Sequence, residues 1–137
     1  MYEIIIATHG SMAQGMKDSL TMFTDKINHV HTISLDEEGI NKFENEAIKL
    51  IETVKDHDTL VLCDIGFATP FNIFAKNAER FHKNVEIIAG FNMPALLEAV
   101  IMQHTSSLDE ITQSFVNSIR PVSLNKQLSA VENSDDE

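Results

Sequence analysis

The sequence is poor in cysteine, in positive charge and in long apolar runs. Its single cysteine excludes a disulfide within the chain and is typical of a reducing compartment. The 10 Lys and Arg against 21 Asp and Glu give a net charge of −11. This balance argues against a nucleic-acid partner, because clustered Lys and Arg bind phosphate backbones. No apolar run approaches the ~20 residues of a membrane span, and we expect no signal peptide, because the N-terminus shows neither a basic n-region nor a cleavage site. We therefore expect a cytoplasmic protein.

The rest of the composition is that of an ordinary globular domain. Hydrophobic residues make up 43% of the 137 residues and charged residues 23%, which suffices for one core. Short apolar runs predict strands at residues 3–9, 29–33, 59–64 and 85–89, and helical spacing predicts helices at residues 12–23, 40–54, 70–81, 93–103 and 108–119. A short final strand is expected at residues 122–124. We expect residues 1–124 to form the domain and residues 125–137 to be a disordered acidic tail.

The alternation of strands and helices predicts the fold class. It is typical of a doubly wound α/β domain with a mostly parallel sheet and helices on both faces. Right-handed crossovers leave few strand orders, and we expect 2-1-3-4, with the short final strand antiparallel. In this order the first and third strands are neighbours whose following helices lie on opposite faces. The crevice between their carboxyl ends is the switch point at which such sheets bind ligands.

Two chemically active side chains stand at the ends of predicted strands. His9 ends the first strand and Asp64 ends the third, so we expect them to meet at the switch point. A carboxylate that accepts N–H from one imidazole nitrogen fixes the tautomer and leaves the lone pair of the other nitrogen free to attack. The same carboxylate stabilises the ring once it carries a phosphoryl group. We therefore predict that His9 is a phosphoacceptor and that Asp64 orients and stabilises it.

Thr69 is the next candidate, directly before Pro70, which suits the first turn of a helix. Its hydroxyl can contact a phosphoryl oxygen beside the N–H groups of that helix end, or it can cap the helix, and both interpretations stay open. No Lys or Arg lies beside these residues, and no glycine-rich phosphate loop is present. Tight nucleotide binding is therefore disfavoured, and we expect no cofactor.

We expect the other polar residues of note to have structural roles. His29 and His31 lie on one face of a predicted strand, but two ligands without a third make a poor zinc site. We expect surface histidines there and no metal. Asn92 is expected to cap a helix, and Ser107 with Glu110 has the spacing of a capping box.

Three motifs, taken together, indicate a family. They are residues 6–10 (Ile-Ala-Thr-His-Gly) with Ala13 and Gly15, residues 64–72 (Asp-Ile-Gly-Phe-Ala-Thr-Pro-Phe-Asn), and residues 89–94 (Ala-Gly-Phe-Asn-Met-Pro) with Leu97 and Glu98. In this order and spacing they resemble the mannose-type EIIA domains (the mannose/fructose/sorbose family) of the phosphoenolpyruvate-dependent sugar phosphotransferase system. The resemblance covers residues 1–124.

The resemblance implies a phosphohistidine carrier, and thus a phosphotransferase component that serves sugar uptake. His9 would accept a phosphoryl group from phospho-HPr and donate it to a histidine of the EIIB component. Asp64 would be the hydrogen-bonded partner of His9, and Thr69 would lie beside the phosphoryl group. The chain would meet the membrane only peripherally, through the sugar permease complex. The family is dimeric, with a final strand that can exchange between subunits, here residues 122–124.

The sequence departs from the family at one loop. The family usually has two glycines where this chain has Phe67 and Ala68, and glycines permit backbone angles that other residues resist. A regulatory version of the domain therefore stays open. Met12 and Met16, on the helix after His9, and Phe67 are the side chains that we expect on the docking face for partner proteins.

Three alternative functions stay open. Relatives of this fold pass phosphate to a dihydroxyacetone kinase or regulate transcription activators. A receiver-like domain would be phosphorylated on Asp64 itself, but that chemistry needs an acidic Mg²⁺ site after the first strand, where this chain has Thr8-His9-Gly10. A nucleotide- or flavin-binding module of similar fold is disfavoured by the missing phosphate loop.

Overall fold

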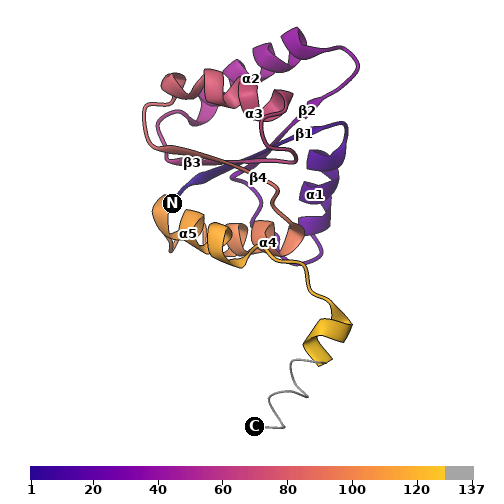
Figure 1. Ribbon diagram of the computed structural model, residues 1–137. Helices are drawn as coiled ribbons and strands as arrows, with labels where there is room; N and C mark the ends of the chain where they lie inside the picture. The colour runs from indigo at the N-terminus through magenta and orange to yellow at the C-terminus, as the bar shows by residue number, and fades with distance from the viewer. Residues whose placement is uncertain (129–137) are drawn as a thin grey trace.

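The computed structural model describes residues 1–128 and centres on one four-stranded parallel sheet (Figure 1). The strands are β1 (Glu3–His9), β2 (Val30–Leu35), β3 (Thr59–Cys63) and β4 (Val85–Ala89). Their order is β2-β1-β3-β4, and all three neighbouring pairs are parallel. The predicted fold class and the predicted order 2-1-3-4 are confirmed.

The burial of each strand follows from its place in the sheet. In β1 the six residues before His9 are all buried, and all of β3 is buried. These are the two central strands, and a strand covered on both faces needs an unbroken apolar run. The edge strands β2 and β4 are only partly buried, which explains the weaker apolar pattern of β2 in the sequence.

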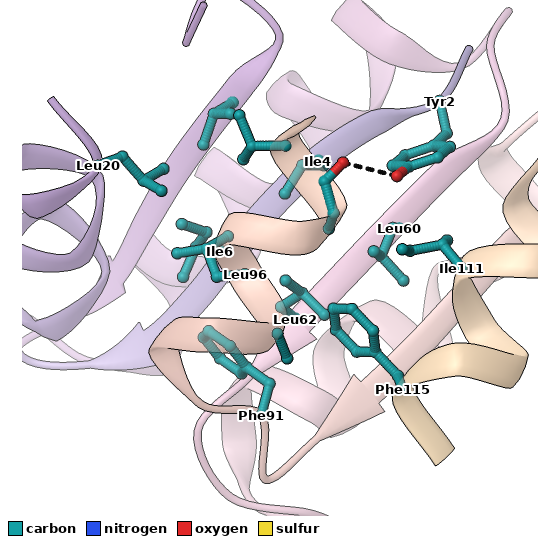
Figure 2. Close-up of a cluster of buried hydrophobic side chains, with 14 of the residues drawn as sticks. Tyr2, Ile4, Ile6, Leu20, Leu60, Leu62, Phe91, Leu96, Ile111 and Phe115 are labelled. Atoms are coloured by element: carbon teal, nitrogen blue, oxygen red, sulfur yellow. Dashed lines mark hydrogen bonds between the residues drawn. The ribbon is translucent and has the colours of Figure 1, made fainter. Parts of the chain in front are cut away.

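Helices cover both faces of the sheet, as Figure 1 shows. One face carries α1 (Met12–Leu20), α4 (Met93–Ile101) and α5 (Leu108–Ser118), and the other carries α2 (Ile40–Val54), α3 (Thr69–Lys76) and the 3-10 helix η1 (Ala78–Arg80). Each face has its own core cluster. In Figure 2, Ile4, Ile6 and Leu62 of the sheet lie against Leu96 and Phe115 of the helices. The hydroxyl of Tyr2, itself buried, donates to the backbone oxygen of Ala99 at 2.6 Å.

Helix ends follow the polar residues of the sequence. Asn92 accepts from the N–H of Ala95 at 3.0 Å, so its predicted role as a cap is confirmed. Ser107 and Glu110 form the predicted capping box. The predicted helix 70–81 is too long, because Asn77 ends α3. The side chain of Asn77 donates to the carbonyl oxygen of Ile73 at 2.8 Å and to Oε2 of Glu44 at 2.9 Å, and its backbone leaves the helical conformation.

Two predictions concern the C-terminal segment: a short strand at residues 122–124 and a disordered tail at residues 125–137. Residues 121–123 have no regular structure, and residues 124–128 are helical, so the single chain forms no strand at residues 122–124. Val122 and Leu124 are 79% and 73% exposed, and the sheet formed within residues 1–128 consists of β1 to β4 and does not include them. The first residues of the expected disordered tail, 125–128, are thus helical, and residues 129–137 lie outside the described part.

The amino edge of the sheet holds a cluster that the sequence does not predict. Glu3 is buried, with 6% of its surface exposed. Its carboxylate contacts Nδ1 of His29 at 3.0 Å and Nε2 of His31 at 2.9 Å. The two histidines are partly exposed, but they bind a buried carboxylate rather than solvent alone. Beside them, buried Gln103 donates to the carbonyl oxygens of Tyr2 at 2.7 Å and His29 at 3.1 Å.

Candidate functional site

The opposite, carboxyl edge of the sheet brings His9 and Asp64 together. Ala7 of β1 and Cys63 of β3 are register partners, so His9, the last residue of β1, lies beside Asp64, which directly follows β3. Nδ1 of His9 lies 2.9 Å from Oδ2 of Asp64, and the backbone N–H of His9 donates to the same oxygen at 3.0 Å. The sequence predicted this meeting from strand order alone.

The electrostatics of Asp64 favour its ionised form. Its side chain is only 11% exposed, and this burial by itself raises the pKa of the carboxyl. Hydrogen bonds from the backbone and ring of His9, and one from the N–H of Ile65 to Oδ1 at 3.0 Å, outweigh burial and bring the pKa below its ordinary value. A carboxylate at this position accepts the N–H of His9 Nδ1 and so leaves Nε2 with its lone pair. The His9 side chain is 42% exposed, so a partner can reach the ring.

Two neighbours of His9 fix the turn from β1 into α1. Gly10 has a φ of 60°, the left-handed region in which a Cβ is disfavoured, and its N–H donates to the carbonyl oxygen of Leu35 at 2.7 Å. Thr8 is fully buried, and its hydroxyl oxygen accepts from the N–H of Ala13 at 2.8 Å. Ser11, the residue before α1, makes no side-chain cap. The Thr8 hydroxyl therefore accepts an N–H of the first turn of α1, a role that was not predicted from the sequence.

Thr69 stands at the start of α3 but does not cap it. The N-cap position belongs to Ala68, and no side-chain hydrogen bond caps the helix, so the capping interpretation of Thr69 is wrong. The first N–H groups of a helix lack intrahelical acceptors. Pro70 has no N–H, and Asn72 donates its backbone N–H to the carbonyl oxygen of Ala68 at 2.9 Å. The N–H groups of Thr69 and Phe71, together with the Thr69 hydroxyl, are the donors of this helix end.

The backbone angles of the loop before α3 differ between Phe67 and Ala68, the two positions at which glycines were expected. Phe67 has a φ of 59°, whereas Ala68 has φ −90° and ψ −179°, an extended conformation open to any residue. Only the first of the two positions therefore needs a glycine-like backbone, and Phe67 adopts it at a cost of about 1–2 kcal/mol. Its ring is 81% exposed, with its centroid 4.8 Å from that of Phe71.

The apolar side chains expected at a docking face differ in exposure. Met12 and Phe67 are 45% and 81% exposed, whereas Met16 is half-buried and packs against the core beneath α1. Ile65, directly after Asp64, is 56% exposed. Ile65 was not among the predicted docking residues, although its position between Asp64 and Gly66, in the loop after β3, could have indicated its exposure. Exposed apolar residues thus lie directly after Asp64 and close to His9 in the chain.

The described part of the chain offers little to other kinds of site. Among residues 1–128, no three or more His, Cys, Asp or Glu side chains are arranged to hold a metal ion. No helix within the same range has the length and apolarity to cross a membrane. The burial of the Cys63 thiol, next to Asp64 in the chain, raises its pKa to about 12, which makes the thiol unreactive.

The fold and this pair define a class of protein: a doubly wound parallel α/β domain that holds a histidine against a carboxylate at the switch point of its sheet. Comparison with known families makes the assignment specific. The family model EIIA-man, described as the phosphotransferase system (PTS) fructose IIA component, matches residues 3–116. The chain belongs to this mannose-type EIIA family of the phosphotransferase system.

Individual relatives agree with this assignment. The chain is 29% identical over 113 residues to the sorbose-specific EIIA component of Klebsiella pneumoniae, covering 82% of this chain and 83% of that protein. It is 26% identical over 110 residues to the corresponding component of Lacticaseibacillus casei, with 80% and 79% covered. The crystal structure of the EIIA component from Streptococcus agalactiae superposes with a TM-score of 0.81 at 25% identity, over 92% of this chain and 99% of that one.

Proposed function

We propose that this EIIA component is a phosphohistidine carrier. Nε2 of His9 accepts a phosphoryl group from phospho-HPr and passes it to a histidine of an EIIB component. The observation that carries the proposal is the 2.9 Å contact between His9 Nδ1 and Asp64 Oδ2. This contact occupies Nδ1 and leaves Nε2 free to react. The His9 side chain is 42% exposed, and transfer between proteins requires an accessible ring.

The bonds and charges of the transfer step balance between the donor histidine and His9, with Asp64 beside the acceptor ring. The lone pair of His9 Nε2 attacks phosphorus while the bond from phosphorus to the donor nitrogen breaks, and the donor imidazole keeps that electron pair. The donor changes from a protonated phosphoimidazolium to a neutral imidazole, and His9 changes from neutral to a phosphoimidazolium that retains its Nδ1–H. Asp64 faces the positive charge that develops on His9, which stabilises the transition state. The reverse sequence delivers the phosphoryl group to EIIB.

The amino end of α3 supports the phosphoryl oxygens in this proposal. α3 begins five residues after Asp64, and the N–H groups of Thr69 and Phe71 belong to its first turn. Helix N-termini favour anions because their N–H groups and the helix dipole both point toward the ligand. The Thr69 hydroxyl, which caps nothing, is available for one phosphoryl oxygen.

Docking of the protein partners involves the exposed apolar residues of this edge. We propose that Met12, Phe67 and Ile65 contact HPr and EIIB, and that Met16 supports Met12 from below, since it packs against the core. The sorbose-specific relatives support a role in sugar uptake. The protein would act in the cytoplasm, peripheral to the membrane through the permease complex, and as a homodimer in which residues 122–124 exchange.

Intact mass spectrometry after incubation with phosphoenolpyruvate, Enzyme I and HPr tests the proposal. The wild type should gain one phosphoryl mass that is lost in acid, and His9→Ala should gain none. A gain that persists in His9→Ala would move the acceptor elsewhere and overturn the proposal. Asp64 is a poor second acceptor, because both of its oxygens are hydrogen-bonded and its side chain is 11% exposed.

A further inference from the structure

The left-handed backbone of Phe67 calls for a physical explanation. Among residues 1–128, Phe67 is the one residue other than glycine with a positive φ, at 59°. A Cβ makes this conformation unfavourable, and the surrounding structure has to hold it. The side chain is 81% exposed, so burial of the ring in the core does not hold it.

Asn72 donates two hydrogen bonds to this loop. Its side-chain Nδ2 donates to the backbone oxygen of Phe67 at 2.9 Å, and its backbone N–H donates to the oxygen of Ala68 at 2.9 Å. One residue of α3 thus binds the last two carbonyl groups before the helix. The ring contact between Phe67 and Phe71 adds a second link between the loop and the same helix.

The position of Asn72 indicates that its side chain serves the loop and not the helix. Asn72 is exposed on α3, where alanine would have the higher helix propensity. Its amide packs into no core, and the one hydrogen bond of that side chain in the described structure is the bond to Phe67. Loss of this amide therefore releases the loop without removing a core contact.

The loop connects the two halves of the site. Asp64 is fixed at one end by His9 and by the N–H of Ile65, and Thr69 begins α3 at the other end. Only residues 65–68 lie between them. A change of φ at Phe67 would therefore turn the start of α3 relative to Asp64 and His9, and misplacement on the scale of 1 Å can slow a positioned reaction by about 100-fold.

We propose that Asn72 is a positioning residue: by holding the carbonyl of Phe67 it keeps the loop 65–68 in a conformation that glycine would adopt unaided, and so sets the amino end of α3 against the His9–Asp64 pair. The effect on transfer rests on the proposed function. The effect on the loop rests on the geometry alone.

The test is a mutant cycle between positions 72 and 67. Asn72→Ala is made with Phe, Ala and Gly at position 67, so that Phe67→Ala removes the ring but keeps the Cβ, whereas Phe67→Gly removes both. The rate at which His9 accepts a phosphoryl group is measured in single turnovers at saturating phospho-HPr, where weaker docking of the Phe67 variants does not limit the rate. Each Asn72→Ala protein is compared with its own background.

The proposal predicts a conditional loss. Asn72→Ala should slow transfer about tenfold with Phe or Ala at position 67, and by less than about twofold with Gly. NMR measurement of the φ angle at residue 67 should show that the positive value is lost in Asn72→Ala and in its Phe67→Ala combination but kept with Gly. Equal losses in the three backgrounds, or an unchanged φ in Asn72→Ala, would overturn the proposal.

The two readouts separate this proposal from the proposed function. If the wild type accepts no phosphoryl group at all, the carrier function fails, while the NMR comparison still decides whether Asn72 holds the loop. If the wild type is phosphorylated but Asn72→Ala transfers at the wild-type rate, the carrier function stands and the role of Asn72 is refuted.

Discussion

At the scale of single residues, the proposed chemistry depends on one carboxylate oxygen. Oδ2 of Asp64 accepts from both the backbone N–H and the ring of His9, so position and charge come from the same group. The carboxylate is largely buried, which strengthens its interaction with a cationic ring. The buried Thr8 hydroxyl serves the same site through the backbone, because it accepts from the N–H of Ala13 at the start of α1.

Asp64→Asn should slow phosphoryl acceptance by about 100-fold while leaving the fold intact, because the amide keeps the shape but loses the negative charge opposite the phosphoimidazolium. Single-turnover transfer from radiolabelled phospho-HPr measures the rate, and circular dichroism checks the fold. His9→Ala serves as the zero point. A rate within about threefold of the wild type would show that the Asp64 charge does not matter.

Asp64 should also make stability depend on pH in the acid range. Its pKa in the folded protein lies below the ordinary value of 3.8, so the folded state binds this proton less tightly than the unfolded state. The stabilisation is therefore present at neutral pH and is lost as the pH falls through the folded pKa. Thermal unfolding should show the wild type above Asp64→Asn at pH 7, with the difference in Tm shrinking below pH 3.8. A constant difference would contradict this.

At the scale of elements, polar side chains pair with several of the backbone groups at helix and strand ends. The N–H of Ala95 donates to the side chain of Asn92, and the side-chain amide of Gln103 donates to the carbonyl oxygens of Tyr2 and His29. The Asn92 contact caps the first turn of α4, and the Gln103 contacts join the segment after α4 to the amino ends of β1 and β2.

Asn92→Ala should lower the free energy of unfolding by about 1 kcal/mol, because one orphan N–H of α4 loses its acceptor. Chemical denaturation measures the change. Asn92→Asp, which keeps an acceptor oxygen, is the matched control and should retain most of the stability. Equal losses in the two variants would mean that the cap does not stabilise α4.

Gln103→Leu should cost about 1–3 kcal/mol, because it removes the side-chain donor to the Tyr2 carbonyl and one of the two donors to the His29 carbonyl, which also accepts from the N–H of Ile4 at 3.0 Å. The matched control is Gln113→Leu on the exposed side of α5, which should change stability by no more than about 0.5 kcal/mol. Urea unfolding of both variants compares them directly. If the two behave alike, the buried amide of Gln103 contributes nothing specific.

At the scale of the whole molecule, local pattern predicted much of the fold. Unbroken apolar runs marked β1 and β3 as central, and crossover rules then brought His9 and Asp64 together. Contacts between residues far apart in the sequence left no such pattern: Glu3 of β1 binds His29 and His31, which lie on or just before the neighbouring strand β2. The positive φ of Phe67 could not be predicted from the sequence either. In our proposal it is held by the hydrogen bond from Asn72 and not by any property of Phe67 itself.

The molecule also carries an unpaired segment after α5. Val122 and Leu124 are 79% and 73% exposed, and we expect them to pack in a homodimer. Sedimentation velocity should show a dimer for the wild type and a shift toward monomer for the pair Val122→Asp and Leu124→Asp. Phe23→Asp, at an exposed position after α1, should stay dimeric. A wild type that is monomeric at all concentrations would contradict the expectation.

The central claim, that Asp64 holds Nδ1 of His9 and leaves Nε2 to react, is tested most directly by determining which ring nitrogen carries the phosphoryl group. Long-range ¹H–¹⁵N and ³¹P NMR of the phosphorylated protein distinguish the two nitrogens. Because Asp64 Oδ2 lies 2.9 Å from Nδ1, the account predicts phosphorus on Nε2 with a proton retained on Nδ1. Phosphorus on Nδ1 would require that contact to break and would contradict the role assigned to Asp64.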